Sequence, residues 1–512
     1  MSQLVSEARK TARGSLMLIA GNALGTFIAG LGSIVLARVL GSGAYGAYTL
    51  SLTVANFLLF FTDPGISAAI TRFSARLTVE KRPGAAVHVI RLGLITRASL
   101  GALATVMGIL FAPMLSLLLL NRPELETVVK IVAVSILPLA AYGAIGSALI
   151  GLSDVKNYSA LYVVQQILRT VLRPLLVITG LGLLGAVIGH VAAVYVVCIA
   201  GLAVLYRVHL KDIKEVNSPN LKDMLVFGLP LFGSSIIGYI SIIYKNIILA
   251  YYTSNIEIGN LTAAQNFVAL LSVLTVPISQ TLFPAFSRLD RKDIGKFYDY
   301  SVKYASLLLV PAALFLAVSS EDAVNIIYGL SYEKAAGLLT LLIFSQMYAG
   351  LNLSTQTLLN GVGETRTVFM ASLLGFCVMA PLTYMLTLNL SVAGFAIATV
   401  ISGAVSTAFL VLQAWRKLNV KPPLQLAKIY FLAVIALPPV ALFKGLRLPG
   451  LITAVIIYIV ILATLAPLIG VVDEEDIDNL RSIFKGIAPL TPVTDLILSY
   501  MEKVRDVKCR YL

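Results

Sequence analysis

The chain has 512 residues, of which 58% are hydrophobic and only 12% are charged, and its mean hydropathy is +0.90. A soluble domain carries about twice that charged fraction, so the composition excludes an ordinary soluble protein and favours one dissolved in lipid. The formal net charge of +14 would suggest nucleic acid on a soluble protein. Here the basic residues lie in short loops between apolar runs, where membrane topology explains them, so we expect no nucleic-acid partner.

The N-terminal segment favours a first membrane span over a removed signal peptide. Its basic start, with Arg9, Lys10 and Arg13, leads into a long apolar run that no small-residue cleavage site follows.

Fourteen apolar runs follow one another along the chain, each close to the roughly 20 residues that a bilayer-crossing helix needs. A polar linker, residues 206–223, separates the first six from the next six, and a last pair comes after them. The expected spans are residues 15–37, 45–70, 86–112, 127–150, 158–180 and 182–205, then 224–250, 260–283, 302–320, 336–360, 367–388 and 392–414, and finally 426–444 and 450–470.

The distribution of basic residues predicts the orientation of these spans. With the N-terminus inside, the inner segments before residue 473 hold 23 Lys and Arg residues and the outer ends hold six. Cytoplasmic loops carry the excess of Lys and Arg, so we expect both termini in the cytoplasm of a protein of the cell membrane.

The segment 473–512 is expected to be a cytoplasmic tail. It opens with four acidic residues and continues into a stretch in which Leu496, Ile497, Tyr500 and Val504 have amphipathic helical spacing. That spacing suits a helix on the inner membrane face. A solvated tail without a task explains the composition equally well.

Two halves of the chain resemble each other at a shift of about 210 residues. The turn 149–156 (LIGLSDVK) matches 359–366 (LNGVGETR), so a glycine, an acid and a base recur. Pro64 with Phe73-Ser74 matches Pro277 with Phe286-Ser287, and Gly185 matches Gly394.

Because six spans is an even number, the second half enters the membrane in the same orientation as the first. Such parallel repeats occur in secondary transporters that work by alternating access. The predicted fold is therefore an all-α polytopic membrane protein, with about 14 transmembrane helices in two parallel-repeat six-helix lobes and a C-terminal helix pair. The expected divisions are 1–210, 211–420, 421–472 and the tail 473–512.

The fifth expected span carries the largest group of polar residues at membrane depth. Gln165, Arg169 and Arg173 follow an i, i+4, i+8 spacing and share one helix face, and Pro174 follows directly. Arginine matches phosphate with a planar, bidentate fork, so this face suits an anion-binding wall. The alternative is a structural role against carbonyls or acids of a neighbouring helix.

Three further charged residues lie within expected spans. Lys245 either lines a cavity or extends its amine to the outer interface, and Arg97 is expected to reach the inner interface in the same way. Asp63 is a candidate site for coupling to a cation or a proton. It could equally pair with a nearby base or cap a break in its helix.

Uncharged polar residues add further candidates for a substrate-binding cavity, although such side chains also join helices to each other. With Arg169, Arg173 and Lys245 against Asp63, the cavity is expected to be cationic and suited to an anionic ligand. The uncharged candidates are Asn22, Gln265, Asn266, Asn352 and Gln356.

Several motifs of catalysis and metal binding do not occur in the sequence. It has neither a phosphate-binding loop nor an H-E-x-x-H pattern, and its cysteines (Cys198, Cys377 and Cys509) lack metal-ligand spacing. His190, alone in an apolar span, is interpreted as a packed residue. We therefore expect no enzyme, no metal and no cofactor, apart from coupling to H⁺ or Na⁺.

Four segments together carry a family resemblance. Residues 21–25 (GNALG) and 36–46 (LARVLGSGAYG) resemble the start of the polysaccharide transporters, the Wzx-like oligosaccharide flippases. Residues 63–73 and the turn 359–366 resemble that family too. The likeness covers the whole chain and places it in the multidrug/oligosaccharidyl-lipid/polysaccharide exporter superfamily.

The resemblance implies a protein that flips a lipid-linked oligosaccharide, with the diphosphate in the cationic cavity and the lipid tail in the bilayer. Membrane lipids and glycan assembly enzymes are the implied partners. A peptidoglycan precursor is disfavoured, because the first span has no arginine between Arg13 and Arg38. The alternatives are a cation-coupled exporter of small amphipathic compounds that uses Asp63, similar to the multidrug branch, and an assembly partner without transport.

Overall fold

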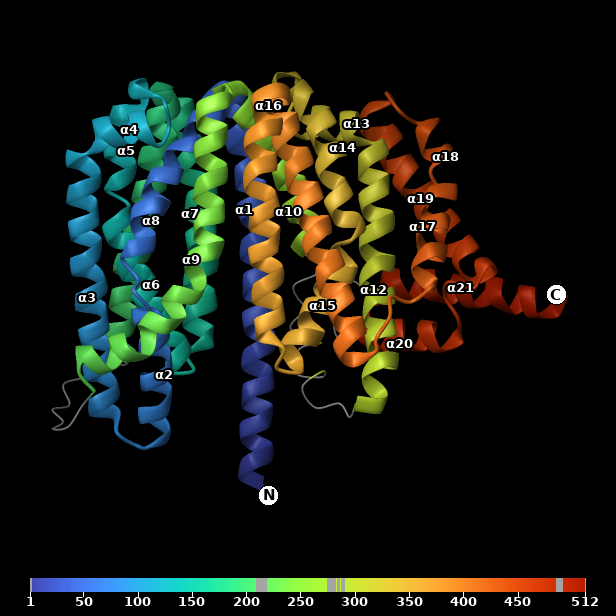
Figure 1. Cartoon of the computed structure of the whole chain (residues 1–512), viewed down its shortest axis with the longest axis horizontal. Coiled ribbons are helices and arrows are strands. Elements are labelled where there is room, and N and C mark those ends of the chain that lie inside the picture. Colours follow the sequence, from blue (N-terminus) through green and yellow to red (C-terminus); the bar gives the residue numbers. More distant parts are fainter. Residues whose placement is uncertain are drawn as a thin grey trace. The chain divides into compact units, whose positions relative to one another are not determined.

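The computed structural model describes residues 2–208, 219–273, 282, 286, 291–484 and 491–511. Within these residues the chain consists of helices and short connections, and no strand occurs among them (Figure 1). The predicted all-α fold is confirmed. Of the sequence anchors named above, Pro277 and Ser287 lie outside the described residues, as does most of the expected linker.

Contacts divide the chain into two compact units. The first comprises Met1–Asn266 and Ala380–Phe395. Its helices are α1 (Ser2–Phe61), α2 (Ile66–Val79), α3 (Pro83–Leu110), α4 (Ala112–Leu118), the short η1 (Pro123–Leu125), α5 (Glu126–Ala133), α6 (Ile136–Gly151), α7 (Val155–Leu176), the π-helical turn η2 (Val177–Leu181), α8 (Gly182–Val208), α9 (Leu221–Tyr252) and the first part of α10 (Asn255–Val273).

The second unit comprises Phe267–Met379 and Ala396–Leu512. Its helices are α12 (Arg291–Val318), α13 (Ser320–Ile327), the short η3 (Leu330–Tyr332), α14 (Glu333–Met347), α15 (Ala349–Gly361), most of α16 (Thr365–Leu418), α17 (Gln425–Ile435), α18 (Pro438–Ala441), α19 (Arg447–Ile469), α20 (Glu474–Phe484) and α21 (Thr491–Tyr511). The predicted divisions at residues 210 and 420 rest on the repeat and stay a prediction.

Among the described residues, seven helices are long and apolar enough to cross a membrane, and the number rises to nine if each of two bent pairs forms one span. The predicted count of 14 is not confirmed. Part of the difference arises because helices continue through tight turns. Residues 155–208 and α16 are each continuous over 54 residues, and each contains two of the expected spans.

Residues with positive φ mark the places where these long helices turn. Ser391 (φ 53°) interrupts α16, Gly180 (φ 93°) lies between α7 and α8, and Gly41 (φ 73°) interrupts α1. One predicted edge is wrong. The expected span 45–70 ends as a helix at Phe61, because the chain turns through Pro64 and Gly65 before α2 begins.

The two halves of the sequence repeat have the same local structure. α6 ends at Gly151 and α7 begins after Asp154, just as α15 ends at Gly361 and α16 begins after Glu364. Gly185 and Gly394 also correspond. A Cβ atom on either would lie within 2.5 Å of a carbonyl oxygen of the preceding helix, Leu176 O at 2.4 Å and Leu386 O at 2.0 Å.

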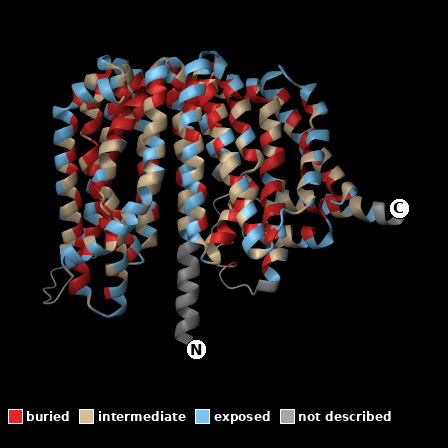
Figure 2. Cartoon of the chain, viewed as in Figure 1, coloured by how far each residue is buried: buried red, intermediate tan, exposed pale blue. Residues whose placement is uncertain are grey.

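Exposed residues are found along the helices of both units (Figure 2), and many of them are large and apolar. On α3, Leu103 and Leu110 are 58% and 69% exposed. Water would penalise such surfaces, whereas lipid does not. Together with the long apolar helices, this distribution is typical of a protein that crosses the membrane several times.

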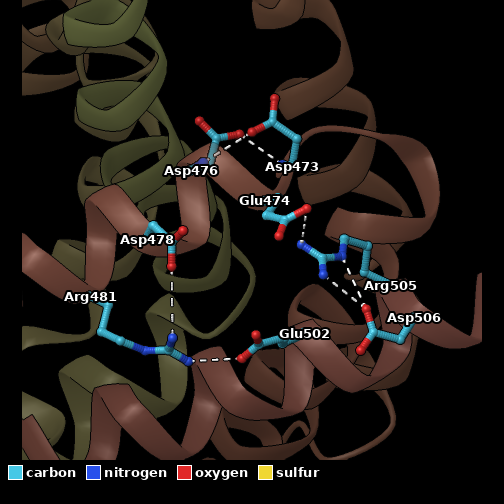
Figure 3. Close-up of polar contacts among 8 residues, drawn as sticks. All are labelled: Asp473, Glu474, Asp476, Asp478, Arg481, Glu502, Arg505 and Asp506. Carbon is cyan, nitrogen blue, oxygen red and sulfur yellow. Dashed lines mark hydrogen bonds and ion pairs between the residues drawn. The ribbon is translucent and has the colours of Figure 1, made fainter. Parts of the chain in front are cut away.

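The C-terminal tail folds back onto the second unit as two helices. Leu498 and Met501 of α21 pack in a buried cluster with Val310 of α12 and Ile429 of α17. Figure 3 shows the ion pairs around α20 and α21, among them Arg481 to Glu502 at 2.9 Å and Arg505 to Glu474 at 3.3 Å.

Candidate functional site

The candidate site lies in the first unit, where α7 packs along α1. Glycines on α1 permit the close approach. A Cβ atom on Gly25 would lie 2.4 Å from Tyr162, and one on Gly32 would lie 2.2 Å from Thr170 Oγ1. Small residues of this kind let two membrane helices approach each other closely. Thr170 also donates a hydrogen bond to the carbonyl of Ile28 at 3.1 Å.

Two tyrosines reach the site from the part of α1 that follows Gly41. Tyr45 and Tyr48 are both 2% exposed, and their ring centroids lie 6.4 Å apart in a stacked arrangement. A buried phenol normally finds a hydrogen-bonding partner for its hydroxyl. Both hydroxyl groups take part in networks that connect α1 with other helices.

Arg173 lies at the centre of the first hydrogen-bond network. Its side chain is buried and its Nε donates to the carbonyl of Arg169 at 2.6 Å, while Nη1 donates to Tyr48 Oη at 3.4 Å. On the far side, Tyr48 Oη lies 3.5 Å from Nδ1 of His190 on α8. Gln165 is buried one turn before Arg169 on the same helix. α7 continues through Pro174 without a break and ends two residues later.

Tyr45 holds the second network together. Its Oη lies 2.6 Å from Ser33 Oγ, and Asn266 Nδ2 donates to Ser33 Oγ at 3.3 Å and to Tyr45 Oη at 3.2 Å. Asn266, a residue that the sequence singles out, therefore connects α10 with α1 beside the arginines.

The charge of this site is not compensated by an acid. Within the described part of the chain, neither Arg169 nor Arg173 forms an ion pair with a carboxylate, and Arg169 Nε is buried without a hydrogen-bond partner. His190 lies close enough to both guanidinium groups to be repelled electrostatically when it is protonated. A buried positive charge without a counter-ion is costly, and an anionic ligand would remove that cost.

The remaining candidates of the first unit lie outside these two networks. Lys245 on α9 and Asn22 on α1 are half-buried, and Gln265 is exposed. No hydrogen bond of these three side chains is found among the described residues. Their predicted cavity-lining role stays a prediction.

Two further candidates belong to the second unit. Asn352 on α15 donates to Thr407 Oγ1 at 2.7 Å and lines a cavity. Gln356, one turn later, is half-buried.

Asp63 is paired, as one of the alternatives from the sequence requires. Its carboxylate forms an ion pair with Arg97 of α3, and its Oδ1 accepts a hydrogen bond from the backbone of Ser67 at 3.0 Å, where α2 begins. Arg97 also donates to Ser67 Oγ at 2.5 Å. The expectation that Arg97 extends to the interface is wrong, because its side chain is buried with 4% exposure.

The sequence alone singles out neither Tyr48 nor the place of His190, and it includes Tyr45 only as part of the segment 36–46 that resembles the family, without a role. The two tyrosines are three residues apart in a conventional helical pattern and are not distinguishable there from packing residues. The histidine is indeed packed, as interpreted, but it packs beside the cations. Only the spatial meeting of α1, α7 and α8 reveals the group.

Comparisons with known proteins agree with this architecture. Residues 11–290 match the family described as "Polysaccharide biosynthesis protein". The chain is 24% identical over 345 residues to the succinoglycan biosynthesis transport protein ExoT of Rhizobium meliloti, covering 65% of this chain and 66% of that protein. It is 22% identical over 409 residues to the probable low-salt glycan biosynthesis flippase Agl15 of Haloferax volcanii, covering 77% and 82%.

Solved structures of membrane transport proteins share this fold. The lipid II flippase MurJ in an inward closed conformation matches with a TM-score of 0.72 at 15% identity, over 88% of this chain and 99% of that one. An inward-facing multidrug transporter matches with a TM-score of 0.64 at 18% identity, over 79% and 96%. The chain thus has several helices that could cross a membrane, and it shares its fold with a lipid II flippase and with a multidrug transporter.

Proposed function

We propose that this chain, which belongs to the polysaccharide biosynthesis protein family, moves a lipid-linked oligosaccharide from the inner to the outer leaflet of the cell membrane by alternating access. The names of its relatives support transport of glycans. Both termini would lie in the cytoplasm, where the excess of basic loop residues is expected. The chain would catalyse no reaction itself and would receive its substrate from glycan assembly enzymes.

One observation carries the choice of ligand. Arg173, which is buried, and Arg169, which is half-buried, lie together on one helix face without a carboxylate partner among the described residues. A diphosphate would supply the missing negative charge, and guanidinium groups bind phosphate oxygens in a bidentate manner. Tyr48 and His190 would hold the arginines in place from behind.

The alternative, a cation-coupled exporter that uses Asp63, has less support. The carboxylate of Asp63 is already neutralised by Arg97. No cofactor is proposed, and the driving force would come from H⁺ or Na⁺ coupling or from consumption of the flipped lipid on the outer side.

Deletion of the gene in its host tests the proposal. The lipid-linked precursor should accumulate on the inner leaflet, where an added membrane-impermeant probe cannot reach it, and surface glycan should fall. The wild-type gene should restore both. Arg169→Ala/Arg173→Ala should restore neither, whereas Arg76→Ala/Arg416→Ala, which removes two exposed arginines, should restore both. Unchanged amount and sidedness of the precursor after deletion would sink the proposal.

A further inference from the structure

The second unit contains a cavity at a break between two helices. α14 and α15 are bent by 40° at Tyr348. The space beside this break has a volume of about 330 Å³, which lies at the small end of the range for ligand sites. Its lining residues are Ser345, Gln346, Tyr348, Ala349, Asn352, Leu353, Gly403 and Ser406.

Hydrogen bonds to neighbouring helices fix the walls of this cavity. Tyr348 Oη donates to the carbonyl of Val400 at 2.9 Å, and a Cβ atom on Gly403 would lie 2.3 Å from that hydroxyl, so only glycine leaves room for the ring. Ser406 Oγ donates to the carbonyl of Ala371 at 3.0 Å. The lining is therefore preorganised, which reduces the entropy lost when a ligand binds.

Gln346 leaves one polar atom of the cavity without a partner. The side chain is only 6% exposed, and its Nε2 donates to Ser345 Oγ at 3.2 Å. Its Oε1 is buried and accepts no hydrogen bond from any described residue. An unsatisfied buried acceptor costs about 1–3 kcal/mol. A ligand with a hydrogen-bond donor would remove that cost.

The chemistry of the lining identifies the class of ligand. No charged side chain lines the cavity, so it offers nothing to a phosphate, in contrast to the arginines of the first unit. The lining combines hydroxyl and amide groups with the aromatic ring of Tyr348. Such a combination fits a sugar, whose hydroxyl groups donate and accept hydrogen bonds and whose C–H faces pack on aromatic rings.

We propose that this cavity binds one uncharged sugar unit of the transported lipid. Gln346 Oε1 accepts a hydrogen bond from a sugar hydroxyl, and Ser345, Asn352 and Ser406 provide further polar atoms. The proposal rests on the proposed function for the source of the sugar. The sugar site goes beyond that function, because it assigns recognition of the neutral glycan to a second site.

Protection of an introduced thiol from alkylation tests this binding directly. Ser345→Cys is made in a full-length chain in which Cys198, Cys377 and Cys509 are replaced by alanine. The purified protein is treated with a maleimide in the presence of polyprenyl diphosphates that carry a hexose or an N-acetylhexosamine disaccharide, or no sugar. A sugar-bearing lipid should slow labelling at least fivefold more than the sugar-free lipid.

Gln346→Leu should abolish this difference, and Gln413→Leu, a glutamine of α16 outside the cavity, should retain it. If Gln346→Leu does not fold, Ser406→Ala in the same background should reduce the protection. Equal protection by all the lipids, protection by none of them, or full protection after Gln346→Leu or Ser406→Ala each overturns the proposal. Labelling measures binding and not transport. A protein that binds the sugar but moves no lipid would therefore refute the proposed function and leave the sugar site standing.

Discussion

Three arginines of the first unit, Arg97, Arg169 and Arg173, fall into two kinds. Arg97 is neutralised by Asp63 and held by Ser67, so its environment is that of a structural ion pair. Arg169 and Arg173 have only carbonyl, phenol and cation neighbours among the described residues. The first kind has its counter-charge within the fold, whereas the second would gain one from the anion proposed above.

Asp63→Asn should destabilise the protein rather than uncouple transport. The substitution leaves the buried guanidinium of Arg97 without its counter-charge, and loss of one partner of such a pair costs about 2–4 kcal/mol, since Asp63 is partly exposed. A fall in the thermal midpoint of the purified protein measures this. The double variant Asp63→Asn/Arg97→Gln should recover part of the loss. A fully stable single variant that fails only in transport would instead support an ion-coupling role.

At the residue scale, the sequence predicts which charged residues share a helix face better than it predicts which residues form ion pairs. The i, i+4, i+8 spacing of Gln165, Arg169 and Arg173 predicts a common face, and the structure places these residues on it. The partner of Asp63 lies 34 residues further along the chain at position 97. Helical periodicity carries no information about such a distant pair, because it depends on how α2 and α3 pack.

At the scale of the helices, the approach of α1 to α7 positions the whole site. Both arginines belong to α7, and both tyrosines belong to α1. The distance between the two backbones decides whether Arg173 reaches Tyr48, and the glycines of α1 set that distance. Gly25 also belongs to the segment 21–25, whose sequence resembles the family, which gives that motif a packing role.

Gly32→Ala should loosen this helix pair. The new Cβ atom would lie 2.2 Å from Thr170 Oγ1 and 2.9 Å from Thr170 Cα, so the helices must shift, at a cost of about 1–3 kcal/mol. Thermal unfolding of the purified variant measures the effect. Gly30→Ala is the matched control, because no atom lies within 4 Å of its Cβ position. Equal midpoints for the two variants would contradict the packing role.

The turn that begins α16 should respond to acid. Hydrogen bonds from Lys417 and Thr367 lower the pKa of Glu364 below its usual value. A lowered pKa in the folded state means that the contribution to stability is complete at neutral pH and is lost as the pH falls through that folded-state value. The difference in thermal midpoint between wild type and Glu364→Gln should therefore shrink towards zero as the pH falls below the ordinary pKa of a glutamate, about 4.3. A difference that grows in acid would contradict this sign.

At the scale of the whole molecule, buried contacts hold the C-terminal tail against the other helices of the second unit. Asp476 of α20 is fully buried, forms an ion pair with Lys303 of α12, and accepts from Tyr304 Oη at 3.0 Å. Of the two alternatives left open by the sequence, the described tail fits neither completely. One face of α21 is packed against protein, while Leu496 and Tyr500 stay exposed.

Asp476→Asn should weaken the packing of the tail against α12. The substitution leaves Lys303, which is 2% exposed, with only the more distant carboxylate of Asp473 at 4.0 Å, and we expect a loss of about 3 kcal/mol. Limited proteolysis should then remove the tail more rapidly. Asp478→Asn serves as the control, because its carboxylate is exposed and contacts Arg481 only at 3.8 Å, so its loss should cost under about 1 kcal/mol. Equal cleavage rates for the two variants would refute this role of Asp476.

The overall architecture follows from the sequence more closely than its details do. Hydropathy predicts an all-helical membrane protein because lipid demands that each segment satisfy its own backbone hydrogen bonds. The repeated turns at Gly151 and Gly361 are visible as sequence and as structure. The number of separate helices is not visible in the sequence. The turn at Ser391 needs only one residue with positive φ, and no common sequence signal marks it.

Transport in proteoliposomes tests the central claim most directly. Purified protein is reconstituted with a fluorescent polyprenyl diphosphate that carries a disaccharide, and the lipid that becomes accessible to an impermeant quencher is followed in time. We expect wild type and Arg76→Ala/Arg416→Ala to move the lipid, and Arg169→Ala/Arg173→Ala to move it at least about tenfold more slowly, which corresponds to about 1.4 kcal/mol. Equal rates for wild type and the Arg169→Ala/Arg173→Ala variant would show that these arginines are structural, and would contradict the account.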